Sequence, residues 1–213
     1  MPGWAGQISG EHRSPTDWKS SVPPAILAVP VRILEKACGL PSERNVGRHS
    51  PFTEFNRMTN SELLQAYLAG PRLLRSATAG LTAEQARQRP VAGRWSTLEV
   101  VAHIADFEPI YADRMKRVLA EDRPAMMSGN PDLFASRLAY HSRDLEEELR
   151  LIETVRGQVA RILGQIAPAD WDRVGLHSTD GAISLRTLLE RVTGHITHHL
   201  PFLAEKRQAL GLS

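Results

Sequence analysis

Apolar residues that recur at helical spacing, from about Asn60 onward, constrain the fold more than any other feature of this 213-residue sequence. Steps of three and four place such residues on one face of an α-helix. The last of these segments is the most regular, and its inward face comprises Leu185, Leu188, Val192, His195, His199 and Leu203. No segment alternates apolar and polar residues over a useful length, as a β-strand would. The pattern predicts an all-α fold.

Capping and helix-breaking residues predict where the helices begin and end. Asn60 or Ser61 is a favourable N-cap for the first helix. Gly70-Pro71 lies in the middle of that helix and should kink or interrupt it, because proline removes a backbone donor and clashes with the preceding turn. Ser96-Thr-Leu-Glu is a capping-box sequence at the start of a second long helix. Beyond the first helix, we expect a short helix over 82–90 and long helices over about 96–120, 132–166 and 184–209. Four long helices indicate a four-helix bundle.

Residues 1–57 differ in composition from the rest of the chain. They hold half of the 14 prolines and show no sustained helical period. Segments of this kind rarely bury enough apolar surface to offset the entropy lost on ordering. The sequence therefore predicts a mostly disordered N-terminal extension over 1–57 and a helical domain over 58–213.

Composition and charge exclude several classes of function. The formal net charge is only +2, so neither nucleic acid nor an anionic membrane is an expected partner. The single cysteine, Cys38, permits no intramolecular disulfide and no Cys-rich zinc site. No apolar run approaches the roughly 18 residues of a spanning helix. The first residues lack the pattern of a secretory signal. A cytoplasmic location is the expectation that remains.

Two histidines interrupt the apolar face of the last helix. His195 and His199 stand one helical turn apart, with Cβ atoms roughly 6 Å from each other, a spacing that suits chelation of one metal ion. Burying both imidazoles without partners would cost several kcal/mol of desolvation or force both to be neutral. A metal ion removes that cost.

The second long helix supplies a third histidine in the same orientation. Its inward stripe contains Val100, His103, Phe107 and Ile110. Because His103 points inward as well, three imidazoles from two helices can share one divalent ion. Three protein ligands leave positions open for water or substrate, which distinguishes catalytic zinc sites from closed structural ones. Such a site can polarise an oxygen atom or lower the pKa of a bound water or thiol.

Two segments around these histidines carry further recognisable residues. The first runs from Gly93 to Glu108 and contains the pattern W-S-x-x-E-x-x-x-H-x-x-D-x-E. The second runs from Gly181 to Leu200 and ends in Gly194-His-Ile-Thr-His-His-Leu200. Together they resemble the closing and central motifs of the DinB/YfiT-like metal-dependent hydrolases, the DinB-like superfamily, over roughly residues 58–210.

The resemblance implies an up-down-down-up four-helix bundle whose metal is held by three histidines, which match His103, His195 and His199. Its members include hydrolases, thiol S-transferases that use bacillithiol or similar cofactors, and mycothiol-dependent isomerases. The family pattern often continues with Gln-Ile, where this chain has Leu200-Pro201, and this proline is expected to bend the helix just past the site. The resemblance is compatible with a homodimer, which periodicity alone does not show.

Other side chains near the motifs have weaker claims. Glu99 and Asp106 lie one turn either side of His103 and could orient its ring, or they could be ordinary helix-surface charges. His198 is turned about 100° from His199, toward the rim or the solvent. Three further residues could line a pocket mouth or form surface ion pairs, with the arginine a candidate anion anchor: Glu108, Tyr111 and Arg114.

The leading functional hypothesis is a metal-dependent enzyme that acts on a small molecule. Its divalent metal, Zn²⁺ or Ni²⁺, would activate water or a low-molecular-weight thiol, and no protein nucleophile is required. A rival from another class is a non-catalytic bundle in which the metal or a small ligand serves stability, stress or sensing. In a third interpretation the histidines are plain core residues, paired with Glu99 and Asp106, and bind no metal.

Overall fold

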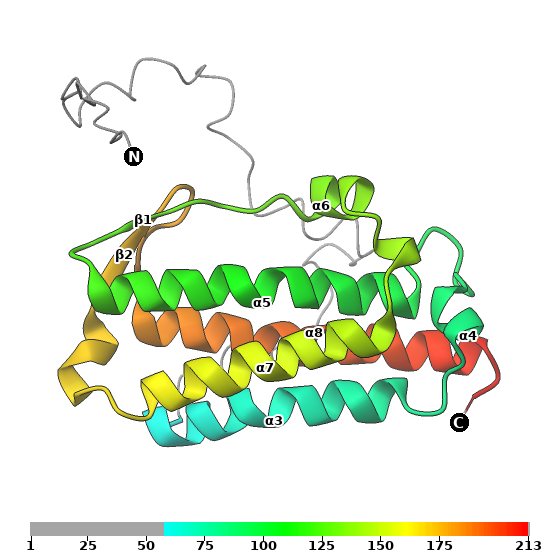
Figure 1. Cartoon of the computed structure of the whole chain (residues 1–213), viewed down its shortest axis with the longest axis horizontal. Coiled ribbons are helices and arrows are strands. Elements are labelled where there is room, and N and C mark those ends of the chain that lie inside the picture. Colours follow the sequence, from blue (N-terminus) through cyan, green and yellow to red (C-terminus); the bar gives the residue numbers. More distant parts are fainter. Residues whose placement is uncertain (1–57, 213) are drawn as a thin grey trace, which may run out of the picture.

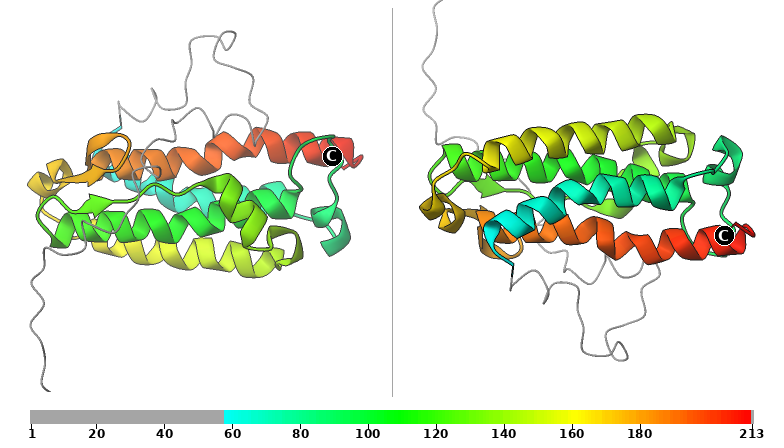
Figure 2. Two further views of the ribbon diagram at one scale, coloured as in Figure 1. Left: turned by 90° about the horizontal axis from the view of Figure 1, so that it is seen from above. Right: turned by 90° about the horizontal axis from the view of Figure 1, so that it is seen from below.

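The computed structural model describes residues 58–212, so the extension predicted over 1–57 lies outside the described residues. Four long helices lie side by side (Figure 1 and Figure 2). They are α3 (Asn60–Thr78), α5 (Thr97–Ala120), α7 (Leu145–Leu163) and α8 (Leu185–Ala209). In Figure 1, α3 and α8 run in one direction along the bundle and α5 and α7 run in the other. The predicted up-down-down-up bundle is therefore confirmed.

The parallel arrangement of α5 and α7 requires the chain to return along the length of the bundle between them. The return passes over α5 (Figure 1) and contains β1 (Ala125–Met126), α6 (Pro131–Arg137) and the 3₁₀ turn η4 (Tyr140–Ser142). The single helix predicted over 132–166 is therefore wrong. Ala139 adopts a left-handed conformation, with φ of 52°, that breaks the helix. Asp144 then caps α7 by accepting hydrogen bonds from the backbone of Glu146 and Glu147.

A small sheet at one end of the bundle was not predicted. It joins β1 to a hairpin of β2 (Val174–His177) and β3 (Gly181–Ser184), which follows the 3₁₀ turn η5 (Pro168–Asp172). β1 pairs parallel to β2, and β2 pairs antiparallel to β3. The sheet ties the return segment to the α7–α8 connection, and its strands of two to four residues are too short to show alternation in the sequence.

The predicted capping sites need only small corrections. A capping box at Ser96 and Glu99 begins α5, as expected, while Thr59 and not Asn60 or Ser61 caps α3. A second box at Thr82 begins the short α4 (Ala83–Arg87). Gly70-Pro71 does not interrupt α3, and α8 likewise continues through Pro201 to Ala209.

A buried polar layer separates two apolar clusters in the bundle. One cluster includes Tyr67 and Val192, and the other includes Ile196. Between them lie Arg156 and Glu108, both fully buried. Arg156 Nε donates to Glu108 Oε1 over 2.8 Å, and its two terminal nitrogens donate to the backbone oxygens of Tyr67 and Val192 over 2.8 and 2.7 Å. The guanidinium therefore connects all three other long helices to α7.

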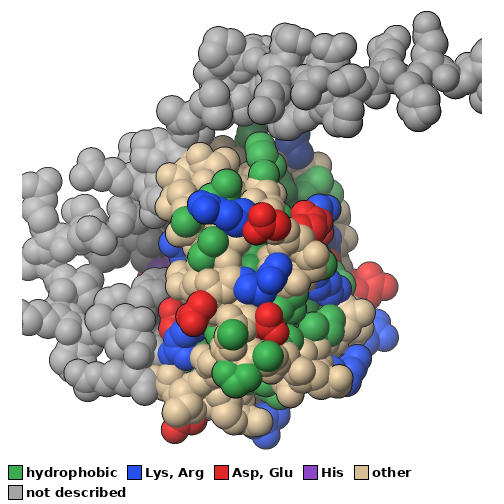
Figure 3. All heavy atoms as spheres, turned by 90° about the vertical axis from the view of Figure 1, so that its left-hand side faces the viewer, with side chains coloured by type: hydrophobic (Ala, Val, Ile, Leu, Met, Phe, Trp, Pro, Cys, Tyr) green, Lys and Arg blue, Asp and Glu red, His purple; other side chains and the backbone are tan. Residues whose placement is uncertain are grey.

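The described residues contain no candidate membrane-spanning helix, and the face drawn in Figure 3 shows no patch of a single charge. None of the helices within 58–212 combines the length and the apolar character that crossing a bilayer demands. On the end of the bundle in Figure 3, basic and acidic side chains are interspersed with apolar ones.

Candidate metal centre

The three histidines singled out from the sequence meet inside the bundle, where α5 packs against α8. Nε2 of His103 lies 3.0 Å from Nε2 of His195. One ring nitrogen from each of His103, His195 and His199 lies within 4.8 Å of the others. The His195–His199 ring centroids are 4.9 Å apart, as the one-turn spacing along α8 predicts.

Burial keeps all three imidazoles neutral. His103 and His199 are 1% and 2% exposed, and His195 is partly buried. Desolvation lowers the pKa of His103 to about 4, although the nearby carboxylate of Asp106 acts in the opposite direction. Burial also holds the pKa values of His195 and His199 well below the ordinary range for histidine. Neutral imidazole is the form that binds a metal ion.

The spacing of the ring nitrogens and the donor set, not the hydrogen bonding, indicate a metal site. Within residues 58–212, the Nδ1 atoms of all three histidines are buried without a hydrogen-bond partner. A metal ion bound at the Nε2 atoms of His103 and His195 would leave their Nδ1 atoms unpaired, so these atoms do not distinguish a metal site from plain core packing. Two nitrogens bound tetrahedrally to one zinc ion would lie ~3.3 Å apart, close to the observed contact between His103 and His195. The all-nitrogen donor set and the spacing thus suit a divalent metal.

Aromatic rings surround the cluster. Trp95 and Phe107 both pack against His103, with centroid distances of 5.4 and 4.8 Å. Phe202 lies one turn beyond His199, at 6.0 Å. Phe134 on α6 covers Phe107 at 5.6 Å, so the return segment helps to close the site. These rings exclude water and lower the local dielectric around any ion held there.

The two acidic neighbours of His103 are used elsewhere. Glu99 accepts from the backbone of Ser96 and from the guanidinium of Arg89. Asp106 accepts two hydrogen bonds from Arg143, over 2.8 and 3.0 Å. Neither carboxylate hydrogen-bonds to the His103 ring in the described structure. Asp106 acts on that ring through its field, as the pKa of His103 shows.

The remaining candidates lie away from the centre of the cluster. His198 is half-buried, and its ring packs on His199 at 5.1 Å. Glu108 is neither at a pocket mouth nor in a surface pair, because it is fully buried against Arg156. Arg114 donates to the backbone oxygen of Met127 and packs over Tyr111 at 5.2 Å.

Two basic residues beside the site were missed in the sequence. Arg94 and Lys206 line a crevice together with His199. Lys206 follows His199 by seven residues, two turns along the same face of α8, and this spacing was a signal available in the sequence. Arg94 directly precedes Trp95 in the first motif, but loop residues have no periodicity from which to predict their orientation.

Comparison with known proteins agrees with this geometry. A relative from Geobacillus thermodenitrificans, named "Putative metal-dependent hydrolase", is 28% identical over 167 residues, which are 78% of this chain and 94% of the relative. The structure of YfiT from Bacillus subtilis, described as an unusual four-helix bundle, matches with a TM-score of 0.69 at 20% identity, over 84% of this chain and 99% of YfiT.

A second solved structure, a mycothiol-dependent maleylpyruvate isomerase, matches with a TM-score of 0.58 at 12% identity, over 70% of this chain and 62% of that one. At such identity these two structures support the fold alone. The family model described as the DinB superfamily matches residues 66–203, which include all three histidines. The chain belongs to the DinB superfamily.

Proposed function

We propose that this chain is a metal-dependent enzyme in which His103, His195 and His199 hold one divalent ion. The observation that carries the proposal is the convergence of three neutral, buried imidazoles from α5 and α8, with ligand atoms within 4.8 Å of one another. The name of the relative from Geobacillus thermodenitrificans points the same way. Imidazole donors accept Zn²⁺ and Ni²⁺, the metals proposed here, as well as Co²⁺ and Fe²⁺.

The ion would supply Lewis acidity, which lowers the pKa of a bound water or thiol toward neutrality. The protein's part is to hold the three imidazoles neutral and to surround the ion with the apolar rings of Trp95, Phe107 and Phe202. The reaction class is hydrolysis or transfer to a low-molecular-weight thiol, and it acts on a small electrophile. The thiol branch is supported by the name of one structural neighbour, a mycothiol-dependent isomerase.

The test begins with elemental analysis of protein purified without a His-tag. We expect about one equivalent of a divalent transition metal in the wild type and a loss of that metal in His195→Ala. Metal-loaded protein is then incubated with model electrophiles, with and without thiols. Turnover only with thiol selects the transferase, and turnover without thiol selects the hydrolase. Wild-type protein that neither carries nor takes up metal would refute the proposal.

A second candidate, a non-catalytic metal-stabilised bundle, is favoured by one observation. His103 and His199 are almost fully buried, which is more typical of a structural site than of an open catalytic one. In that case His195→Ala lowers the melting temperature, but the metal-loaded wild type turns over neither class of substrate.

A further inference from the structure

A nitrogen atom of a buried arginine on α7 bridges the two helices that carry the three histidines. Nη2 of Arg156 donates to Oε1 of Glu108 on α5, over 2.5 Å, and to the backbone oxygen of Val192 on α8, over 2.7 Å. Nε of the same guanidinium donates to the same carboxylate oxygen over 2.8 Å. Because Arg156 and Glu108 are both fully buried, water does not compete for these bonds. The guanidinium therefore links α5 directly to α8.

This link lies close to the proposed metal ligands on both helices. Glu108 follows His103 by five residues along α5, and Val192 precedes His195 by three residues along α8. These separations correspond to roughly 7.5 and 4.5 Å of helix rise. Burial is the main cause of the low pKa of His195, and interactions with His103 and Arg156 lower that pKa further. The guanidinium is thus within electrostatic reach of one ligand ring.

The relative position of α5 and α8 decides whether the three imidazoles can share one ion. His195 and His199 are one turn apart on α8, so that helix alone sets their spacing. His103 is on α5, and its distance from the other two rings depends on how α8 slides or rotates against α5. A metal site tolerates deviations of only about 0.2 Å in the distances to its ligand atoms. The register of α8 against α5 must therefore be fixed close to the ligands.

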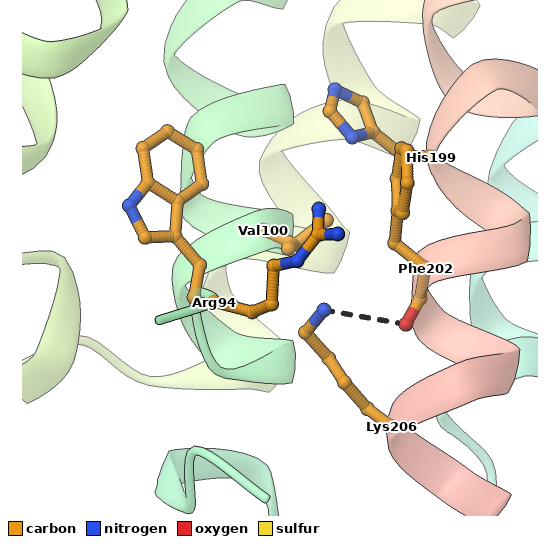
Figure 4. A pocket seen from close by; sticks show the side chains of 6 residues that line it. Arg94, Val100, His199, Phe202 and Lys206 are labelled. Atoms are coloured by element: carbon orange, nitrogen blue, oxygen red, sulfur yellow. Dashed lines mark hydrogen bonds between the residues drawn. The ribbon is translucent and has the colours of Figure 1, made fainter. Parts of the chain in front are cut away.

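Apolar packing fixes this register less tightly than a hydrogen-bonded guanidinium does. Hydrophobic burial has no preferred direction, whereas a hydrogen bond requires a donor–acceptor distance of about 2.7–3.2 Å and a nearly linear geometry. Figure 4 shows a crevice of about 10 Å³ between the two helices, with His199 of α8 and Val100 of α5 in its lining. The side chains of α5 and α8 therefore do not close completely at this level. A directional contact from a third helix compensates for such a gap.

We propose that Arg156 is a positioning residue, which holds α5 and α8 in the register that lets their histidines share one metal ion. It acts through the Glu108 carboxylate on one helix and the Val192 carbonyl on the other, and it does not bind the ion itself. The inference rests on the proposed function, because it explains how the fold holds the metal ligands of that function. It predicts that metal affinity can be lost while stability is kept.

The experiment compares Co²⁺ binding to the full, untagged chain and to two double variants. Arg156→Met with Glu108→Leu removes the bridge between α5 and α8 and leaves the net charge unchanged. Arg75→Met with Glu153→Leu is the matched control, because it makes the same two substitutions in a partly exposed ion pair between α3 and α7. Urea unfolding of the metal-free proteins, followed by circular dichroism, identifies conditions in which all three are fully folded. Co²⁺ is titrated under those conditions, and its visible absorption measures binding.

We expect the variant without the α5–α8 bridge to bind Co²⁺ about tenfold more weakly than wild type, with a changed absorption spectrum, because its ligands are no longer held in place. The α3–α7 control should bind within about twofold of wild type. A purely structural role for Arg156 predicts a shift in the urea midpoint only. A loss of Co²⁺ affinity no larger than that of the control therefore overturns the inference while the metal site stands. If the wild type binds no Co²⁺, the proposed function fails and the inference fails with it.

Arg156→Lys decides the outcome if the double variant does not fold. Lysine keeps the positive charge beside Glu108, but its ammonium group lacks the planar fork with which the guanidinium reaches both helices. We expect this variant to bind Co²⁺ more weakly than wild type by more than about twofold. A smaller change in affinity would show that the charge alone suffices, and the positioning role would be refuted.

Discussion

Replacement of Arg156 by methionine should destabilise the bundle more than any single surface change. The arginine is fully buried and bonds to Glu108 and to the backbone oxygens of two other helices. Methionine fills most of the volume, so the main effect is electrostatic. It leaves the Glu108 carboxylate buried among apolar residues without its cation.

Removing one partner of a buried ion pair costs about 3–5 kcal/mol. In a folded region of this size, that corresponds to a drop in melting temperature of about 6–20 °C. Burial already raises the pKa of Glu108, and the positive charge of Arg156 opposes that rise. Without the arginine, the folded state binds a proton that the unfolded state releases above its lower pKa. The stability of Arg156→Met should therefore fall as the pH rises from about 5 to 8.

Urea unfolding followed by circular dichroism at pH 5 and pH 8 measures both effects. Arg150→Met on the same helix is the matched control, because Arg150 is exposed and its partner Glu146 lies 4.0 Å away. We expect less than about 0.5 kcal/mol there. The double variant with Glu108→Leu should recover most of the loss, since no unpaired charge remains. An Arg156→Met protein within about 1 kcal/mol of wild type at pH 8 would contradict the reasoning.

Three further predictions address the glycine beside this pair, the metal and the pH. In urea unfolding, Gly70→Ala should destabilise the protein by about 1–3 kcal/mol, because the new Cβ would lie 2.3 Å from a terminal nitrogen of Arg156. Gly157→Ala is the control, because its Cβ would have its nearest neighbour at 3.7 Å, and it should be neutral or stabilising. Zn²⁺ or Ni²⁺ at a hundredfold excess over its dissociation constant should add about 2.7 kcal/mol, and calorimetry should show no such gain after chelation or in His195→Ala. Metal-free protein should lose stability as the pH falls from about 6.5 toward 4, by up to about 1.4 kcal/mol per pH unit for each buried histidine. Burial lowers the pKa of His103 to about 4, so over this range the unfolded chain binds more protons than the folded protein does. A flat stability profile over that range would argue against neutral imidazoles.

The elements whose ends carry strong local signals were predictable. Ser96 and Glu99 fix the start of α5, and Ser184 fixes the start of α8, within a residue of the expected positions. The convergence of the histidines followed from the same periodicity, because inward-facing side chains at matching heights on two packed helices lie close together in the core. Periodicity does not identify the metal ion or the substrate.

The break between α6 and α7 was missed because an apolar stripe continues across it. Asp144 with three following glutamates is a helix-start signal that local capping rules could have recognised. The small sheet was missed because its strands of two to four residues are too short to show alternation, and because β1 pairs with β2, which is distant in sequence. The buried pair of Arg156 and Glu108 was also unpredictable, since only tertiary packing shows which charged residues on a helix turn inward.

The distance along the chain between the helices that carry the proposed ligands has a consequence for assembly. His103 and His195 are 92 positions apart, yet their ring nitrogens touch across the α5–α8 contact. A polypeptide whose synthesis has not reached α8, or one truncated before α8, contains only one of the three histidines, His103. Metal binding at the proposed site would therefore follow the docking of α8, and a chain truncated before α8 should not retain the ion.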